Sequence, residues 1–543
     1  MIKDQLEKIL GFGLEATENP DFGDYSSNVA LQSQSPHERV KTIVEKLKTD
    51  KELTKLIDRI ETAGPGFINF WLRRDVLVDN LIEIDSTKEK YGTTDVGKGK
   101  TVIIDYSSPN IAKPFGIGHL RSTIIGQALC NLFKALGYEV VGDNHLGDWG
   151  TQFGKLLYMI KLKDVKDFDI AKLEELYVEF HKLVEADGNL EGKAREWFKK
   201  LEEGNPEAKS IWQKCVEVSV QEFDRVYKLL GVKIDFAFGE SYYESEMREM
   251  IGDPAMQRHL ENGEDDAKII DLSTRGIETP LMFLKSDGAT TYATRDLATI
   301  KFRVRKWNPD IIIYEVGAEQ SLHFKQVFAA AKLLGLVKDS VELVHTAHGL
   351  YLAPDGRKFS TRKGKTIKLE EVLSEAVKRA EKLGNSNSKV AKEVGIGAIK
   401  YFDLMHSVQS NVVFDWEKMM NLEGNSGPYL QYTVARTNSV LAKATLKGTT
   451  LQGEYSNLNN EETLVLRSLV KFPEIIESSA KLYSPNVLCT YLYDLAQKYN
   501  GFYNINRILD SDNEEFRLAL TFGVGQVLKN GLKLLGIASP ERM

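Results

Sequence analysis

The sequence contains few cysteines. Its 3 cysteines, Cys130, Cys215 and Cys489, lie far apart in the chain and show no paired spacing. This excludes a disulfide framework and a cysteine-rich zinc site, and we expect no metal ion held by the protein itself. Such sparse cysteine usage fits a protein that works in reducing surroundings.

Long hydrophobic runs are also absent. The longest aliphatic runs, such as Ile311-Ile312-Ile313, fall far short of the ~20 residues that a membrane-spanning helix needs. Residues 1–7 mix both charge signs and lack the apolar core of a secretory signal and the arginine-rich character of a transit peptide. We therefore expect a soluble, cytoplasmic protein without a membrane partner.

A surplus of positive charge is missing as well, since the net charge is -7. The overall charge gives no indication of a nucleic-acid partner, although local basic surface can bind phosphates in an acidic protein. What is present is a globular composition, with 42% hydrophobic and 27% charged residues. At about 150 residues per domain, the 543 residues indicate three or four domains.

Patterns of strand and helix divide the chain into three parts. Residues 1–85 mix helical and strand-like segments and predict a small α+β domain, after which a charged stretch indicates a linker. Residues 86–368 predict an α/β domain with a parallel sheet, interrupted by a helical insertion at about 168–230. Residues 369–543 carry amphipathic helical patterns and predict an all-α bundle.

The α/β class rests on two β-α-β patterns in the middle part. A buried strand, a helix that stops before Gly137 and a second strand follow one another, which is the crossover that builds parallel sheets. The same order returns further along the chain. The predicted strands are 101–106, 139–142, 311–316 and 341–345, and the predicted helices are 119–136 and 321–334.

The segment between the first strand and its helix, residues 107–123, contains the most informative motif. Gly116 and Gly118 lack side chains, so a ligand can approach the backbone, and His119 and Ser122 lie at a helix N-terminus that favours anionic phosphate. Ligands of open α/β sheets bind at this carboxyl edge, and a nucleotide fits. On its own, the motif is equally compatible with a glycine-rich turn that ends in a polar capping residue.

A second motif lies near the end of the sheet domain, at residues 355–364. It combines hydroxyl groups with four cations, Arg357, Lys358, Arg362 and Lys363, which suit a polyphosphate. A loop of this kind can close over a ligand while charge develops. Taken alone, the pattern is more typical of a solvated surface turn.

Together, the two motifs resemble the HIGH and KMSKS signatures of class I aminoacyl-tRNA synthetases. Residues 116–119 match the first signature and residues 358–361 the second. Further segments resemble the arginyl-tRNA synthetase family specifically. They are residues 107–113, 144–154 and 360–364 in the middle part, 22–25 and 63–69 in the first, and 427–432, 535–537 and 540–543 in the last.

This resemblance implies an architecture and a reaction. The implied fold is a Rossmann-like catalytic domain, a small N-terminal domain that contacts tRNA and a helical anticodon-binding bundle. The implied reaction ligates L-arginine to tRNA(Arg) in two steps, through an arginyl-adenylate that forms from ATP with release of pyrophosphate. We further expect Mg²⁺ bound through the ATP phosphates, a monomeric protein and no hydrolytic editing.

The resemblance also assigns residues to the site. Catalysis is implied for Lys113, His119, Lys358 and Ser360, and ATP binding for Gly116, Gly118, His119 and Lys358. Arginine binding is implied for Ser108, Asn110, His119, Tyr292, Asp296 and Gln320, with Asp105 and Glu240 as further acidic candidates. Carboxylates suit this substrate because they accept bidentate hydrogen bonds from a planar guanidinium. Without the resemblance, Tyr292 and Asp296 would be interpreted as a core tyrosine and a helix N-terminal acid.

Two positions depart from the family pattern. Gly116 stands where the first signature usually begins with histidine, and Thr361 stands where the second usually carries its second lysine. The resemblance implies that Lys113 supplies the charge that Thr361 lacks. The missing histidine leaves an alternative open, a catalytically weakened paralogue that binds tRNA. The remaining signature residues favour the enzyme.

Overall fold

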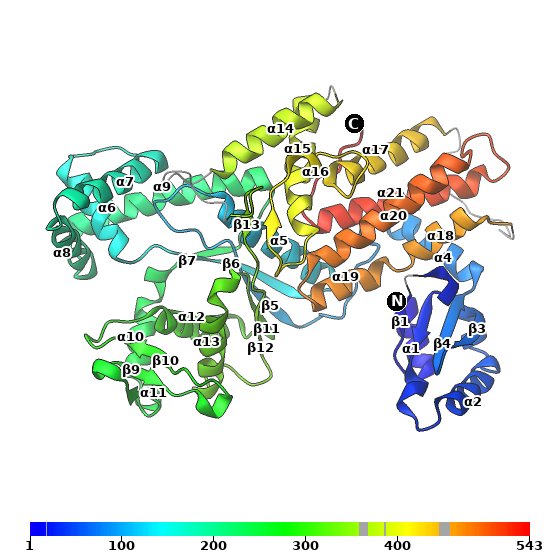
Figure 1. Ribbon diagram of the computed structural model, residues 1–543, viewed down its shortest axis with the longest axis horizontal. Helices are drawn as coiled ribbons and strands as arrows, with labels where there is room; N and C mark the ends of the chain where they lie inside the picture. Colours follow the sequence, from blue (N-terminus) through cyan, green and yellow to red (C-terminus); the bar gives the residue numbers. More distant parts are fainter. Residues whose placement is uncertain (18, 358–367, 385–386, 445–456) are drawn as a thin grey trace. The chain divides into compact units, whose positions relative to one another are not determined.

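The structure is a computed structural model that describes residues 1–17, 19–357, 368–384, 387–444 and 457–543 (Figure 1). The chain divides into two compact units. One consists of residues 1–94, 380–405 and 417–543, and the other of residues 95–379 and 406–416. The first unit therefore unites the two ends of the chain, and the second contains its middle.

The described part of the first unit begins with an antiparallel sheet of order β1-β2-β4-β3. Its strands are β1 (Glu15–Ala16), β2 (Tyr25–Ser27), β3 (Ile57–Ala63) and β4 (Phe67–Leu72), accompanied by α1 (Ile2–Leu10), α2 (Pro36–Lys48) and α3 (Leu53–Leu56). Strand β4 lies inside the sheet, and its alternating residues Ile68, Phe70 and Leu72 are buried. The predicted small α+β domain is thus present at this end.

Helices make up the rest of the first unit. They are α4 (Arg74–Thr87), α15 (Ser388–Leu404), α17 (Gly427–Lys443), α18 (Asn460–Leu469), α19 (Phe472–Lys481), α20 (Pro485–Ile505) and α21 (Glu514–Leu534). Helix α21 packs against α4, α17 and α20. Helix α17 approaches α15 so closely that a Cβ atom on Gly427 would lie 2.7 Å from the carbonyl oxygen of Gly397, so this position requires glycine. Two of the boundaries between the units fall within α14 (Leu369–Gly384) and α16 (Trp416–Met419).

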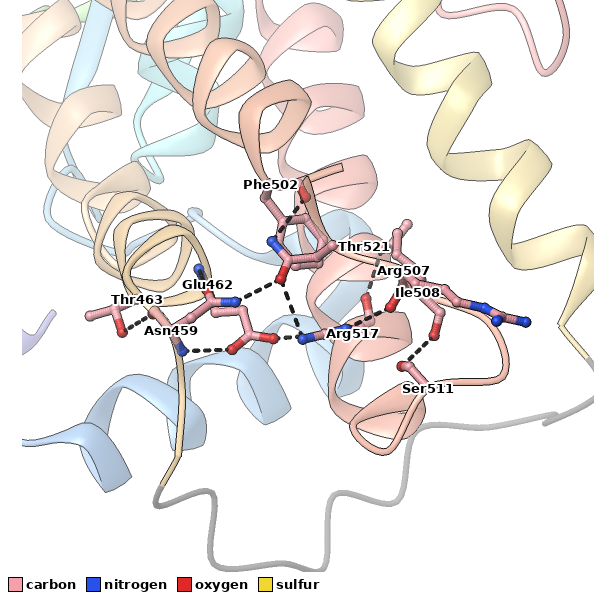
Figure 2. Close-up of polar contacts among 10 residues, drawn as sticks. Asn459, Glu462, Thr463, Phe502, Arg507, Ile508, Ser511, Arg517 and Thr521 are labelled. Atoms are coloured by element: carbon pink, nitrogen blue, oxygen red, sulfur yellow. Dashed lines mark hydrogen bonds and ion pairs between the residues drawn. The ribbon is translucent and has the colours of Figure 1, made fainter. Parts of the chain in front are cut away.

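An ion pair between α18 and α21, with hydrogen bonds to the segment that follows α20, connects three helices of this bundle (Figure 2). Arg517 of α21 donates from Nε to Oε1 of Glu462 in α18 at 2.8 Å, and from Nη1 to the carbonyl oxygen of Arg507 at 2.6 Å. Glu462 is fully buried, and its Oε2 atom accepts the backbone N–H of Asn459 at 2.9 Å. The Asn459 side chain donates to Asn506 at the end of α20. The network holds the connection between α20 and α21 against the start of α18.

The described part of the second unit is built on a five-stranded parallel sheet of order β12-β11-β5-β6-β7. Its strands are β5 (Thr101–Asp105), β6 (Glu139–Leu146), β7 (Phe236–Gly239), β11 (Ile311–Tyr314) and β12 (Glu342–His345). Helix α5 (Leu120–Ala135) connects β5 to β6, while α12 (Tyr292–Trp307) precedes β11 and α13 (Ser321–Leu333) follows it. The predicted Rossmann-like α/β class is confirmed.

Two segments extend this sheet domain. Helices α6 (Thr151–Leu162), α7 (Ile170–Ala186), α8 (Leu190–Glu202) and α9 (Pro206–Leu230) separate β6 from β7. Between β7 and β11, α10 (Glu244–Gly252) and α11 (Pro254–Gln257) lead into an antiparallel sheet of β8 (Glu261–Asn262), β9 (Lys268–Ile270) and β10 (Leu281–Leu284). The sequence patterns do not predict this second sheet, because strands of two to four residues carry too little alternation.

A short strand pair brings a distant segment into the second unit. Strand β13 (Tyr351–Leu352) pairs in parallel with β14 (Val412–Val413), which belongs to residues 406–416.

In the part of the chain that the structure describes, no helix combines the length and apolar character needed to cross a membrane.

Candidate active site

The candidate site forms where the chain changes direction within the sheet. From β5 the chain continues to β6 and β7 on one side, and it later adds β11 and β12 on the other. The loops that leave β5 and β11 therefore diverge at the carboxyl edge, where open α/β sheets bind ligands. A cavity of about 500 Å³ lies here. Its lining includes the predicted residues Ser108, Asn110, Tyr292, Asp296 and Gln320, and both further candidates, Asp105 and Glu240.

The loop after β5 has an unusual backbone conformation. Ser107 and Ser108 have φ angles of 76° and 44°, in the left-handed region that residues other than glycine rarely adopt. Hydrogen bonds hold this shape, since the Ser107 N–H donates to Oγ of Ser122 at 2.8 Å and the Ser108 N–H to Oδ1 of Asn144 at 2.9 Å. The Ser122 hydroxyl donates to the carbonyl oxygen of Glu315 at 2.7 Å. Ser122 therefore shapes the loop through these bonds within the protein.

Asn110 packs against the loop that follows β6. Asn110 and Gly147 form a parallel bridge, and the Ile111 N–H donates to the carbonyl oxygen of Gly147 at 3.1 Å. A Cβ atom at Gly147 would lie only 2.4 Å from Oδ1 of Asn110. Glycine at position 147 thus allows the Asn110 side chain to lie at the cavity.

Two acids of the cavity face basic side chains of the same chain. Oδ2 of Asp296 lies 2.5 Å from Nε2 of His323, and Oε2 of Glu240 lies 3.3 Å from Nη1 of Arg295. Burial raises the pKa of Glu240, and the charge of Arg295 opposes that rise. Carboxylates placed in this way can accept hydrogen bonds from a cationic ligand.

Tyr292 presents an aromatic face beside these acids. It is the first residue of α12, whose N-terminus is capped by the Thr291 side chain, and it is 71% exposed. Its ring centroid lies 5.5 Å from Cζ of Arg295. Tyr292 already lies beside the guanidinium group of Arg295. Its ring can therefore also stack on a guanidinium group of a substrate.

The HIGH-type loop holds a neutral histidine. The Gly116 N–H donates to Nδ1 of His119 at 3.3 Å. Burial, and to a lesser extent the charge of Lys113, lower the pKa of His119 to about 4. Since Nδ1 accepts, Nε2 carries the proton and can donate. A Cβ atom at Gly118 would meet nothing within 4 Å, so the backbone there is open to a ligand.

Residues 368–369, which follow the second signature in the sequence, lie beside the HIGH-type loop. Gly116 forms an antiparallel bridge with Lys368, and the Leu369 N–H donates to the carbonyl oxygen of Phe115 at 3.0 Å. The segment that follows the KMSKS-type motif therefore runs beside the HIGH-type loop. The predicted residues Lys358 and Ser360 lie outside the described residues.

His119 is the one arginine-binding candidate that is not among the residues that line the cavity. The catalytic candidate Lys113 does not line it either. Lys113 is exposed, and its Nζ lies 5.6 Å from the ring centroid of Tyr177 in α7. It therefore extends toward the helical segment that follows β6.

The sequence patterns do not identify the basic residues that pair with the two acids of the cavity. His323 lies three residues after Gln320, and Arg295 directly precedes Asp296, but nothing in the local pattern pairs either residue with an acid.

The sequence analysis also does not name a cluster of one arginine and two tyrosines on the helical bundle. Cζ of Arg436 lies 4.9 Å from the ring centroid of Tyr432 and 5.0 Å from that of Tyr503, and both tyrosines are exposed. The i, i+4 spacing of Tyr432 and Arg436 was the available signal.

A parallel sheet with a HIGH-type loop at its switch point defines a class I aminoacyl-tRNA synthetase, and residues 80–416 match the family model "tRNA synthetases class I (R), catalytic domain". Residues 1–72 match "Arginyl tRNA synthetase N terminal domain", and residues 430–543 match "DALR anticodon binding domain". The chain belongs to the arginyl-tRNA synthetase family.

Relatives match over most of the chain. Arginine–tRNA ligase 1 of Bacillus cereus is 42% identical over 98% of this chain and 95% of its own length. Arginine–tRNA ligase of Chloroflexus aggregans is 41% identical over 89% of this chain and 87% of its own. The crystal structure of Plasmodium falciparum arginyl-tRNA synthetase has a TM-score of 0.82 at 26% identity, covering 100% of this chain and 98% of that one. The Thermus thermophilus arginyl-tRNA synthetase shares the fold, with a TM-score of 0.84 at 22% identity over 100% of both chains.

Proposed function

We propose that this chain ligates L-arginine to tRNA(Arg). ATP and arginine form arginyl-adenylate with release of pyrophosphate, and the arginyl group then passes to the 3′-terminal ribose of the tRNA. The observation that carries this proposal is the acid-lined cavity at the sheet switch point, in a chain of the arginyl-tRNA synthetase family. Catalysis of this kind needs no protein nucleophile, because positioning and charge stabilisation suffice.

The cavity supplies the groups that arginine needs. Asp296 accepts hydrogen bonds from the guanidinium, and Tyr292 stacks on its plane. Ser108 and Asn110 contact the α-amino and α-carboxylate groups, and Gln320 completes the pocket. Support comes from the fact that all five residues line one cavity. A neutral analogue would leave Asp296 without the cationic substrate group that it is proposed to bind, so it should be rejected strongly.

ATP binds beside this cavity, along the HIGH-type loop. The open backbone at Gly118 admits the nucleotide, and Nε2 of His119 donates to a phosphate. Lys113, Lys358 and Ser360 add cations and a hydroxyl group. Gly116 contributes only its backbone to ATP binding, because glycine has no side chain.

Mg²⁺ enters with the nucleotide. Among the described residues, no group of three or more His, Cys, Asp and Glu side chains is arranged to hold a metal ion. In this proposal the ion is bound through the ATP phosphates, because Mg²⁺ usually binds with substrate phosphates and only a few protein carboxylates.

The three parts of the chain divide the work. Residues 86–368 carry the chemistry, and residues 1–85 contact the tRNA. Residues 369–543 read the anticodon, where Tyr432, Arg436 and Tyr503 offer rings and a cation on which an unpaired base can stack. The chain acts as a monomer in the cytoplasm. The alternative of a weakened tRNA-binding paralogue has no support from the relatives, which are named as ligases over nearly the whole chain.

Aminoacylation with labelled arginine tests the proposal. Lysine and citrulline serve as substrates that should fail, and pyrophosphate exchange is measured with and without tRNA. We expect charging with arginine alone, and its loss in Asp296→Ala. A wild-type protein that binds tRNA but charges nothing at high ATP would overturn the proposal and favour the weakened paralogue.

A further inference from the structure

Arg303 is fully buried and contacts two residues that line the cavity, Asp105 and Tyr314. It belongs to α12, the helix that also carries Tyr292 and Asp296. Its Nη2 atom donates to Oδ2 of Asp105 at 2.8 Å and to Oδ2 of Asp143 at 2.7 Å, and its Nε atom donates to the same oxygen of Asp143 at 2.9 Å. One guanidinium thus joins the last residue of β5 to Asp143, which lies within β6.

The group formed by Arg303, Asp105 and Asp143 contains one basic and two acidic side chains. Two carboxyl groups share one guanidinium, so the three side chains carry one net negative charge when both acids are ionised. Burial raises the pKa of Asp143, and the charge of Arg303 opposes that rise. Asp143 is fully buried, whereas Asp105 lines the cavity and accepts the Ser108 hydroxyl through Oδ1 at 3.2 Å. A buried net charge is unfavourable until an opposite charge approaches. Asp105 is the member of the group that a cation in the cavity can reach.

We infer that Arg303 is a positioning residue for arginine recognition. By bonding Oδ2 of Asp105, it fixes that carboxylate beside Ser108 and directs the net negative charge of the group toward the positive substrate. The inference rests on the proposed function, because it assigns a role in binding the same substrate.

Lysine could not replace this arginine. The guanidinium uses two nitrogens in a fixed plane, and its Cζ lies 5.1 Å from the ring centroid of Tyr314, which also lines the cavity. A lysine ammonium is a single point on a flexible stem, so it can neutralise the acids without holding Asp105 in one orientation. Comparing arginine with lysine at position 303 therefore separates the effect of the positive charge from the effect of the hydrogen-bond geometry.

The test compares Arg303→Lys with Arg305→Met. Arg305 lies on the same helix, is 58% exposed and pairs with Glu246 at 2.8 Å, away from the cavity. For Arg303→Lys, we expect KM for arginine to rise about tenfold or more while KM for ATP stays within about twofold. For Arg305→Met, both constants should stay within about twofold of the wild type. An unchanged KM for arginine in Arg303→Lys would overturn the inference.

A double variant separates positioning from stability. Arg303→Met leaves two acids without their partner and is expected to unfold readily, whereas Arg303→Met with Asp143→Asn removes one charge of each sign. We expect the double variant to regain thermal stability but to keep the raised KM for arginine. Recovery of both quantities would show a purely structural role and overturn the inference. If the wild type does not charge tRNA with arginine, the proposed function fails. If the wild type charges tRNA and Arg303→Lys is unaffected, only the inference about Arg303 is refuted.

Discussion

The imidazole of His323 lies 2.5 Å from the carboxylate of Asp296, through Nε2 and Oδ2. The acid that we assign to the substrate guanidinium is therefore already held from one side by α13. Its position does not depend on the substrate, which is the preorganisation that selective binding requires.

We expect Asp296→Asn to reduce kcat/KM for arginine about a hundredfold, because losing one partner of a charge pair costs about 3 kcal/mol. Steady-state arginylation checks this, with Asp287→Asn in an exposed turn as the matched control. A decrease of the same size in the control variant would show that the effect is not specific to the pocket.

We expect His119→Ala to lower kcat about a hundredfold, because a donor to the ATP phosphates is lost. Because burial lowers the pKa of His119 to about 4, we expect its imidazole to stay uncharged in the ligand-free protein from about pH 5.5 to 8. NMR titration of the imidazole signal, assigned by its absence from His119→Ala, measures this. A titration centred near the ordinary pKa of histidine would contradict the neutral imidazole.

Glu474 should make stability depend on pH. The Tyr25 hydroxyl donates to its carboxylate, and burial raises the pKa of Glu474 to about 7 from its ordinary value of 4.5. The fold therefore favours the protonated acid, so this contribution is complete below pH 4.5 and is lost as the pH rises through 7.

We accordingly expect Glu474→Gln to raise the thermal midpoint at pH 8.5, with a gain of up to about 3 kcal/mol that disappears near pH 4.5. Thermal unfolding at both pH values measures the difference. Glu477→Gln on the same helix is the control and should show no such pH-dependent gain.

We expect Arg517→Met to destabilise the bundle by about 3–5 kcal/mol, because it leaves the fully buried Glu462 without its cationic partner (Figure 2). Thermal unfolding checks this. Adding Glu462→Gln should restore much of the loss, and Arg507→Met, whose side chain is 72% exposed, should change little. An equal loss in Arg507→Met would argue against the buried pair as the cause.

We expect Tyr432→Ala to raise KM for tRNA about tenfold and to leave KM for arginine unchanged, since one stacked base contributes about 1–3 kcal/mol. Arginylation at varied tRNA concentration measures both constants. Tyr242→Ala, at an exposed tyrosine of the other unit, should leave both unchanged. A raised KM for arginine in Tyr432→Ala would indicate a general disturbance of the fold.

Local sequence determined much of this protein. The strands at 101–105 and 311–314 were predicted within two residues, because buried strands and the helices between them follow from side-chain periodicity and from signals such as Gly137. The loops that carry Ser108 and His119 were located for the same reason, since a loop after a strand reaches the carboxyl edge in any parallel sheet. The family resemblance then supplied the functions that we propose for these residues.

Only the tertiary structure decided which residues meet. The pairing of Arg303 with Asp143, 160 positions apart, depends on β5 lying between β6 and β11, and the pairing of His323 with Asp296 depends on how α12 and α13 pack. Periodicity describes which face of an element is buried, but it contains nothing about strand order. Strand order arises from the packing of the whole chain, and it places the charged partners that set the electrostatics of the site.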